Sequence, residues 1–257
     1  MTGEVIAERQ GQALTLTLSN PAKRNSIDMG MYDVLEQELL TAAEDSSLKA
    51  VILQGSGQSF AGGTDIAHLE SIETGQQGVE YEAHMARVQK ALIALRIPVI
   101  SVVRGPCVGG GLVLAALSDL VFCVPSSRFG SPIARTLGNT LSATSIARLN
   151  QCFGRRTTAE MLLTARLFSA EEAERRGFVT AVVEEENLDE YVNQVLDSIR
   201  AAAPLTIWSI KEFQGRIDQH AAKVEVDDVY AKVYQSADFR EGVQSFLGKR
   251  KPEFTGE

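Results

Sequence analysis

Three short apolar runs, separated by stretches of helical spacing, restrict the folds open to this chain more than any other feature. AVILQG (50–55), PVISVV (98–103) and LVFCV (120–124) each stop at or just before a glycine, arginine or proline. Apolar runs of this length are typical of buried strands. Helical spacing over residues 78–95 and 112–118 makes the connections crossovers, so the strands pair largely in parallel. The sequence therefore predicts an α/β fold.

The segments on either side of these strands have clear local patterns. ALTLTL (13–18) alternates with a period of two and, with residues 4–9 and Gly11, predicts a hairpin. A helix is predicted over 29–44, capped by Asp28. From Ser142 onward helices dominate, apart from a short strand over 179–183.

The helical tail sets the predicted domain organisation. Ser169 and Glu172 form a capping box that opens a short helix. Further helices are predicted over 187–203, 204–217, 221–234 and 239–247. We predict a core over residues 1–195 and a helical C-terminal region over 196–257.

Composition narrows the class of partner. A net charge of −8 argues against a nucleic-acid groove, and no run approaches the roughly 20 apolar residues of a membrane span. The N-terminus has neither the basic region nor the apolar core of a signal peptide. Three widely spaced cysteines favour a reducing compartment over a disulfide framework or zinc site. We expect a cytoplasmic protein with no metal, nucleic acid or membrane partner.

Two glycine-rich loops follow predicted parallel strands directly. GSGQSFAGGTDIAHL (55–69) follows the first strand, and RGPCVGGGLVL (104–114) follows the second. Such turns bring backbone N–H groups together at helix starts, where the helix dipole favours an anion. Glycine permits the close approach because it has no Cβ. Neither loop has the spacing of a Walker or dinucleotide motif, so the pattern predicts an oxyanion site.

Five segments, in order, resemble the crotonase (enoyl-CoA hydratase/isomerase) superfamily. NPAKRNSID (20–28) resembles its first CoA-binding loop, SFAGGTDI (59–66) its first oxyanion motif, and PVISVVRGPCVGGGLVLAALSDLVF (98–122) its second. LTARLFSAEEAERRGFV (163–179) and SADFREGVQSFLGKRKPEF (236–254) resemble its later helical signature and its ending. The resemblance runs nearly end to end.

This resemblance implies a spiral of ββα units whose C-terminal helices mediate trimerisation, giving a homotrimer or a dimer of trimers. It implies an acyl-CoA substrate and no cofactor beyond the CoA of that substrate. Carried over by position, the oxyanion N–H groups belong to Thr64 and Gly110. The substrate-binding positions are Lys23 and Arg24 near the CoA phosphates, and Ala61, Gly63, Asp65 and Ile66, whose backbone lies around the adenine. Further phosphate candidates are Lys211, Lys249 and Lys251.

The sequence departs from the family at both catalytic carboxylates. Hydratases carry a Glu three residues after the second oxyanion glycine and another after the proline of a motif like FGxPE. Here Val113 and Ile133 occupy those positions. General acid–base help is worth about 10² to 10⁴ in rate, so the two-Glu route to hydration is in doubt. The loop after Ile133 is one residue longer than usual, which makes Arg135, Thr136 and Asn139 candidates for the vacated space.

Three side chains are candidates for the missing chemistry, each with a structural alternative. Glu82 lies on the helix that often flanks the acyl pocket in this family, and its side chain either has a catalytic role there or faces solvent. His68 follows Thr64 by one helical turn, so its ring either leans toward the acyl pocket or lies on the protein surface. Arg135 binds a substrate carboxylate or orients water, or bonds loop carbonyls. The weaker candidates are Glu80, His84 and His220, and we interpret Asp119 as structural.

Three functions stay open. The first is hydration or double-bond isomerisation of an enoyl-CoA. The second is decarboxylation or thioester hydrolysis of an acyl-CoA, because loss of CO₂ needs an electron sink but no carboxylate base. The third is acyl-CoA binding without catalysis. Turnover of an acyl-CoA separates the third from the others.

Overall fold

The computed structural model describes residues 2–221 and 225–256, with only the backbone described at 218–221. A six-stranded sheet forms its centre, in the order β1-β2-β3-β4-β6-β9. The predicted hairpin of β1 and β2 is antiparallel, and all further neighbours pair in parallel, which confirms the α/β prediction. The strands are β1 (Glu4–Gln10), β2 (Ala13–Ser19), β3 (Ala50–Gly55), β4 (Val99–Val103), β6 (Leu120–Cys123) and β9 (Ala181–Val182).

Both faces of this sheet are covered, which explains why its strands are continuous apolar runs. All of β4 is buried, and successive residues belong to different cores. Val99 and Val103 pack in the larger core, which contains α1 (Met29–Glu44), α2 (Gly75–Ala94) and α3 (Gly110–Leu117). Ile100 and Val102 pack in the smaller core against α8 (Leu188–Ala201).

Side-chain caps fix the starts of α1 and α2. The Asp28 carboxylate accepts a hydrogen bond from the Met31 amide at 2.9 Å, as predicted for α1. α2 begins three residues before the predicted position, because Thr74 and Gln77 form a capping box that the hydrophobic pattern did not reveal.

A second, three-stranded sheet was not predicted. Its strands are β5 (Pro106–Val108), β7 (Arg128–Gly130) and β8 (Phe168–Ser169), in the order β5-β7-β8. Around it lie α4 (Ile133–Thr136), α5 (Ala143–Phe153), α6 (Arg155–Thr164) and α7 (Ala170–Arg175). The Gly109 amide donates to the Gly130 carbonyl at 3.0 Å, so this sheet holds the loop that opens α3.

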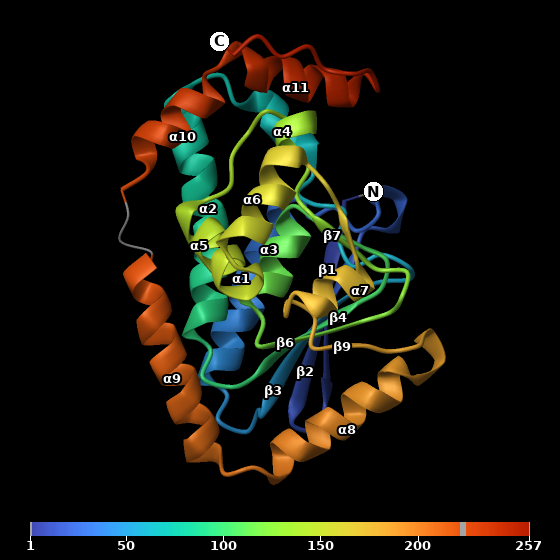
Figure 1. Ribbon diagram of the computed structural model, residues 1–257. Coiled ribbons are helices and arrows are strands. Elements are labelled where there is room, and N and C mark those ends of the chain that lie inside the picture. Colours follow the sequence, from blue (N-terminus) through green and yellow to red (C-terminus); the bar gives the residue numbers. More distant parts are fainter. Residues whose placement is uncertain (1, 222–224, 257) are drawn as a thin grey trace.

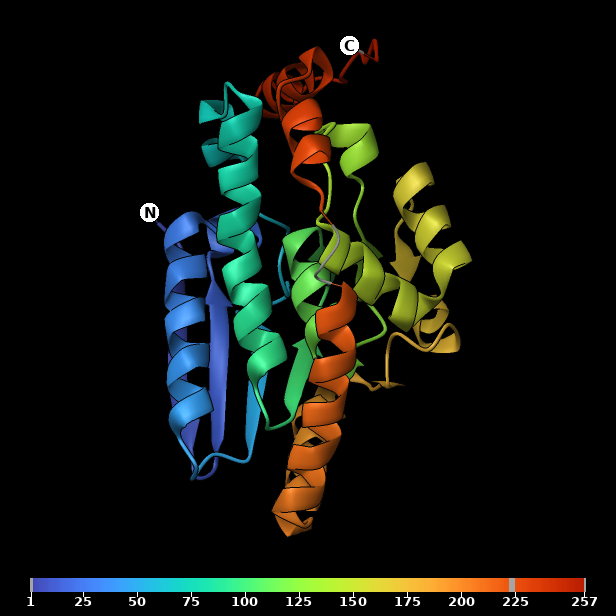
Figure 2. The same cartoon turned by 90° about the vertical axis from the view of Figure 1, so that its left-hand side faces the viewer.

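The C-terminal helices surround the core. The boundary expected between residues 195 and 196 falls inside α8, whose Leu188, Val192 and Leu196 pack on the sheet. Then come α9 (Pro204–Ala221), α10 (Asp227–Tyr234) and α11 (Ala237–Leu247), and α10 and α11 lie over one end of α2 (Figures 1 and 2). The helix predicted over 221–234 begins at Asp227; residues 222–224 and the side chain of His220 lie outside the described residues.

Helix α9 is tied to the sheet by an ion pair. Lys211 Nζ lies 2.8 Å from both carboxylate oxygens of Asp119, and Asp119 also accepts the Val99 amide at 2.7 Å. Asp119 therefore has the structural role expected of it. The expectation that Lys211 binds a CoA phosphate is wrong, because its side chain is only 10% exposed and its ammonium is committed to the Asp119 carboxylate.

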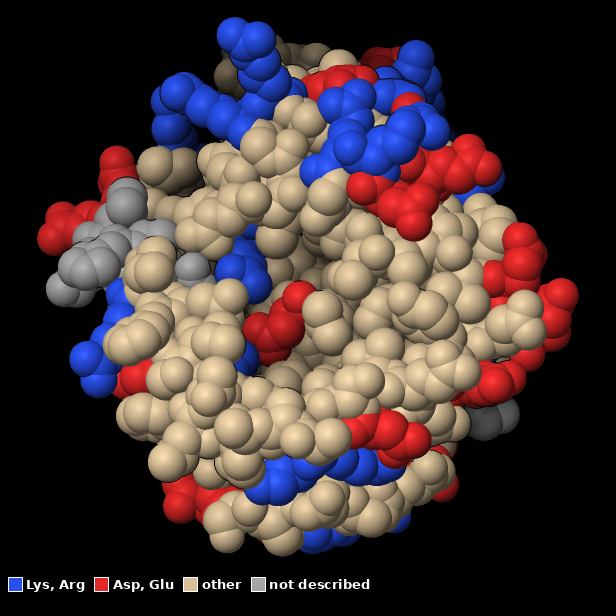
Figure 3. Space-filling view, turned by 60° about the horizontal axis from the view of Figure 1, so that its bottom comes forward, with Lys and Arg blue, Asp and Glu red and all other residues tan. Residues whose placement is uncertain are grey.

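Helix α9 also leaves large apolar side chains in contact with solvent. Figure 3 views the end where α8 meets α9, and it shows a broad uncharged area there. The exposed apolar residues of α9 are Leu205, Trp208, Ile210, Phe213 and Ile217. Within the described residues, no helix is long and apolar enough to cross a membrane.

The tie between Lys211 and Asp119 predicts a loss of stability in Lys211→Met. The variant keeps the apolar stem but leaves the carboxylate without its cation, at a cost of about 2 kcal/mol in the free energy of unfolding. Urea denaturation followed by circular dichroism measures this. The exposed Lys90→Met is the matched control and should unfold like the wild type. Equal stability of the two variants would contradict the assigned role.

Candidate active site

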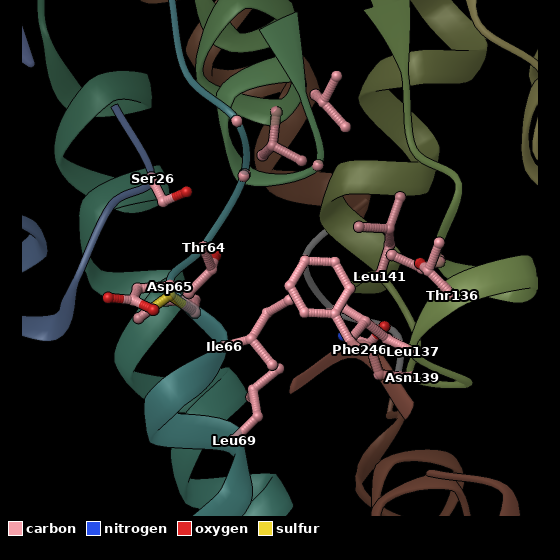
Figure 4. A pocket seen from close by; sticks show the side chains of 18 of the residues that line it. Ser26, Thr64, Asp65, Ile66, Leu69, Thr136, Leu137, Asn139, Leu141 and Phe246 are labelled. Carbon is pink, nitrogen blue, oxygen red and sulfur yellow. The ribbon is translucent and has the colours of Figure 1, made fainter. Parts of the chain in front are cut away.

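A cavity of about 790 Å³ lies between the loop before α1, the 3-10 helix η2 (Ile66–Ser71), α2, α3, the segment from α4 to α5, and the end of α11. In Figure 4, Ser26, Thr64 and Asp65 lie on one side of this cavity, and Thr136 and Leu141 lie on the other. Phe246 of α11 lies between Ile66 and Asn139. The cavity thus joins parts of the chain that are far apart in sequence.

The backbone around Thr64 is fixed by a short parallel bridge to Ile27. The Ile27 amide donates to the Gly63 carbonyl at 2.9 Å, and the Asp65 amide donates to the Ile27 carbonyl at 2.8 Å. Ile27 bonds to the residues on both sides of Thr64. The N–H of Thr64 itself therefore points away from Ile27. Thr64 also lines the cavity.

The backbone of Gly110 meets Thr64 across the same wall. Gly110 is the first residue of α3, where an N–H group has no partner within the helix. A Cβ added to Gly110 would lie 3.6 Å from the Thr64 amide nitrogen and only 2.4 Å from the Tyr32 hydroxyl. Gly63 and Gly109 have φ values of 110° and 54°, which favour glycine. The two predicted N–H donors are therefore neighbours at a helix start.

Glu82 of α2 is buried, lines the cavity and accepts a hydrogen bond from the Tyr234 hydroxyl of α10. Burial raises the pKa of its carboxyl to about 7, although the bond from Tyr234 acts in the opposite direction. A carboxyl with this pKa exchanges its proton readily near neutral pH.

Glu82 is the acid of this cavity that has no cation beside it. Among the described residues that line the cavity, the other acid is Asp65, whose carboxylate lies 2.5 Å from Lys23 Nζ. Val113 and Ile133 line the cavity with apolar side chains. Any proton transfer by a carboxyl within this lining therefore falls to Glu82.

His68 and Arg135, the other two candidates for the missing chemistry, lie outside the cavity lining. His68 is exposed, and its ring centroid lies 6.1 Å from that of Tyr81. Arg135 is exposed, and its guanidinium donates to the Thr164 carbonyl at 2.6 Å. Of the weaker candidates, His84 pairs with Asp33, and Glu80 is exposed. The structural alternatives given for His68 and Arg135 therefore describe these two residues.

Some of the expected substrate-binding positions line the cavity and others do not. Lys23, Arg24, Gly63, Asp65 and Ile66 line the cavity, as does Lys249 at the end of α11, whereas Lys251 is exposed and outside the lining. The expectation for Ala61 is wrong, because its amide donates to the Pro106 carbonyl and its own carbonyl accepts the Val108 amide. The Asp65 amide is likewise taken by Ile27.

No sequence pattern predicted that tyrosines lie around Glu82. The Tyr32 hydroxyl lies 2.9 Å from Thr64 Oγ1, and burial raises the pKa of Tyr32 to about 12. Tyr234 is fully buried, and 152 positions separate it from Glu82. Isolated tyrosines at helical spacing predict only a packed helix face, so no local signal marks these contacts.

A family model described as enoyl-CoA hydratase/isomerase matches residues 8–257. The chain belongs to the enoyl-CoA hydratase/isomerase family. This confirms the crotonase resemblance and identifies the chain as an acyl-CoA enzyme of that family.

Individual relatives of this family member catalyse different reactions. It is 29% identical to 2,3-dehydroadipyl-CoA hydratase of Escherichia coli K12, over 98% of this chain and 99% of that one. It is 27% identical to 1,2-epoxyphenylacetyl-CoA isomerase of the same organism, over 98% of each chain. Its fold matches methylmalonyl-CoA decarboxylase in complex with 2-nitronate-propionyl-CoA, with a TM-score of 0.88, 26% identity and full coverage of both chains.

The contact between Tyr234 and Glu82 predicts a pH effect in Tyr234→Phe. The hydroxyl hydrogen bond lowers the pKa of Glu82, so removing it should raise that pKa above its wild-type value near 7. The infrared band of the protonated carboxyl, assigned by its absence in Glu82→Gln, reports the titration. Tyr230→Phe, on the same helix, is the control and should shift the pKa of Glu82 less. An unchanged titration in Tyr234→Phe would contradict the contact.

Proposed function

We propose that this enzyme isomerises the double bond of an enoyl-CoA, with Glu82 as its single proton carrier. One observation carries the proposal: a buried carboxyl without a cation lines the same cavity as two neighbouring backbone N–H donors. A 1,3-proton shift needs one group that takes a proton from one carbon and returns it to another. One carboxyl with a pKa near 7 suits that task.

The reaction proceeds through an enolate. The thioester oxygen accepts hydrogen bonds from the Thr64 and Gly110 N–H groups, and each such donor is worth about 10² to 10³ in rate. The Glu82 carboxylate removes a proton from the α carbon of a β,γ-enoyl thioester, and the electron pair delocalises onto the thioester oxygen. Protonation of the γ carbon by the same carboxyl gives the α,β-enoyl thioester and restores the carboxylate.

Hydration fits this lining less well. Adding water requires one group to take a proton from the water while the α carbon receives another. Val113 and Ile133 offer no polar group where family hydratases have carboxylates. Isomerisation needs no second carboxyl.

Positive charge in the cavity lining supports binding of CoA. Lys23, Arg24 and Lys249 line the cavity from two distant parts of the sequence. We propose that they bind the CoA phosphates, although the protein as a whole is acidic. A few local cations suffice for an anionic ligand, and the attraction weakens as salt increases.

Decarboxylation of a carboxyacyl-CoA is the second candidate. Its support is the close fold match to methylmalonyl-CoA decarboxylase. Loss of CO₂ leaves the same thioester enolate, so the same two N–H donors serve both reactions. Protonated Glu82 would then deliver a proton to the α carbon.

Glu82→Gln should separate these cases. It keeps the size of the side chain and an acceptor for Tyr234 but cannot carry a proton. We expect isomerisation of 3-hexenoyl-CoA to fall about 10² to 10⁴-fold in kcat with little change in KM. The absorbance of the conjugated thioester follows the reaction. Glu80→Gln, exposed on the same helix, is the control and should keep wild-type activity.

The assay has three informative outcomes besides the expected one. Activity retained in folded Glu82→Gln would refute the role of Glu82. Release of CO₂ from methylmalonyl-CoA without isomerisation would favour the second candidate. Tight CoA binding without turnover of either thioester would mean a binding protein.

We also propose that the protein assembles as a trimer or a dimer of trimers. The support is the run of exposed apolar side chains on α9, which a monomer would leave in water. Light scattering at micromolar concentration should give the mass of three or six chains. Phe213→Asp, near the middle of that helix, should lower the mass while keeping the helical circular dichroism. A monomeric wild type would contradict the proposal.

A further inference from the structure

A second polar group lies further along α2 than Glu82. Gln89 follows Glu82 by seven residues, which places it two turns on, on the same face, roughly 10 Å along the helix axis. Both side chains line the cavity, and Gln89 is only 8% exposed. Between them the cavity wall is apolar and includes Met85 and Val88.

Two serines hold one end of the Gln89 amide. The Ser142 hydroxyl donates to Gln89 Oε1 at 3.3 Å, and the Ser145 hydroxyl lies 3.5 Å from the same oxygen. The two serine hydroxyls lie 2.8 Å apart, and Ser142 also caps α5 by accepting the Ser145 amide. The amide carbonyl is therefore fixed by the start of a helix.

The other end of the amide is left for a ligand. Among the hydrogen bonds of the described residues, none involves Gln89 Nε2, although the side chain lies in the cavity wall. Asn139 lines the same cavity, and its buried Oδ1 has no partner in the described part of the chain. The unpaired Asn139 oxygen is costly to bury unless a bound molecule supplies a partner, and the Gln89 amide offers a hydrogen-bond donor in the same cavity wall.

The charge of this region restricts that molecule. The basic side chains among the described lining residues are Lys23, Arg24 and Lys249, which we assign to the CoA phosphates. With no cation near Gln89 in that lining, a carboxylate bound there would be desolvated without compensation. A hydroxyl accepts such a hydrogen bond without bringing a charge into this region, so it suits the Gln89 N–H.

We propose that the acyl chain of the substrate carries a hydroxyl group at its distal end, which accepts a hydrogen bond from Gln89 Nε2. This specificity rests on the proposed acyl-CoA function, because it concerns the far end of the same cavity. It makes Gln89 the residue that distinguishes hydroxylated from plain aliphatic acyl groups.

Binding of saturated thioesters tests the proposal without requiring catalysis. Calorimetry compares hexanoyl-CoA with 6-hydroxyhexanoyl-CoA, and octanoyl-CoA with 8-hydroxyoctanoyl-CoA. In at least one pair, the wild type should bind the hydroxylated thioester about tenfold more tightly or better. Gln89→Met, of nearly the same shape, should abolish or invert that preference while binding the aliphatic thioesters at least as well. Gln76→Met, exposed on the same helix, should keep it.

The results also distinguish this proposal from the catalytic one. Equal or weaker binding of both hydroxylated thioesters by the wild type would overturn the specificity proposal, whatever the enzyme does with enoyl thioesters. An unaltered preference in Gln89→Met would overturn it as well. ω-Carboxyacyl-CoA bound more tightly than the hydroxylated thioester would show that the distal group is an anion instead. A protein that does not isomerise enoyl thioesters but still prefers the hydroxylated thioesters would support the role of Gln89 and would refute only the isomerase proposal.

Discussion

The arrangement of two backbone N–H groups is the constraint on which the rest of the site depends. Two neighbouring parallel strands, β3 and β4, lead into the loops that carry Thr64 and Gly110. Hydrogen bonds from Val108 to Ala61 and from Gly109 to Gly130 join these loops to each other and to the second sheet. The donors therefore depend on a network of main-chain bonds that encloses the start of α3. Such a preorganised pair costs little reorganisation when an anion forms beside it.

The C-terminal helices complete a site whose N–H donors come from the core. Tyr234 of α10 bonds to Glu82, Phe246 and Lys249 line the cavity, and α11 packs against η2. The helical tail is therefore more than an assembly surface. It supplies the neighbour that orients the proposed proton carrier and part of the charge expected to bind CoA. The cavity lining therefore includes residues that come into place when the end of the chain packs against the core.

Much of the fold and part of the site could be predicted from the sequence, for identifiable reasons. The buried strands, the hairpin and the cap at Asp28 have local patterns, and the two loops were found because glycine is required there. The β5-β7-β8 sheet was missed because β8 has two residues, too few for any periodicity. Lys211 was misassigned because a lone lysine does not reveal that Asp119, distant in sequence, is its partner. Gln89 and Tyr234 acquire their roles only through tertiary contacts.

The use of main-chain groups for the proposed anion site has an evolutionary consequence. A substitution changes a side chain but leaves the amide in place, so most mutations around this cavity cannot remove the donors. In the proposed mechanism, gaining or losing a carboxyl at position 113, 133 or 82 would change which proton moves without changing where the enolate is held. Gly63 and Gly109 have less freedom to change, because their backbone angles favour glycine. A lineage built on this scaffold can therefore change its reaction through single mutations without first dismantling the part that makes the reaction possible.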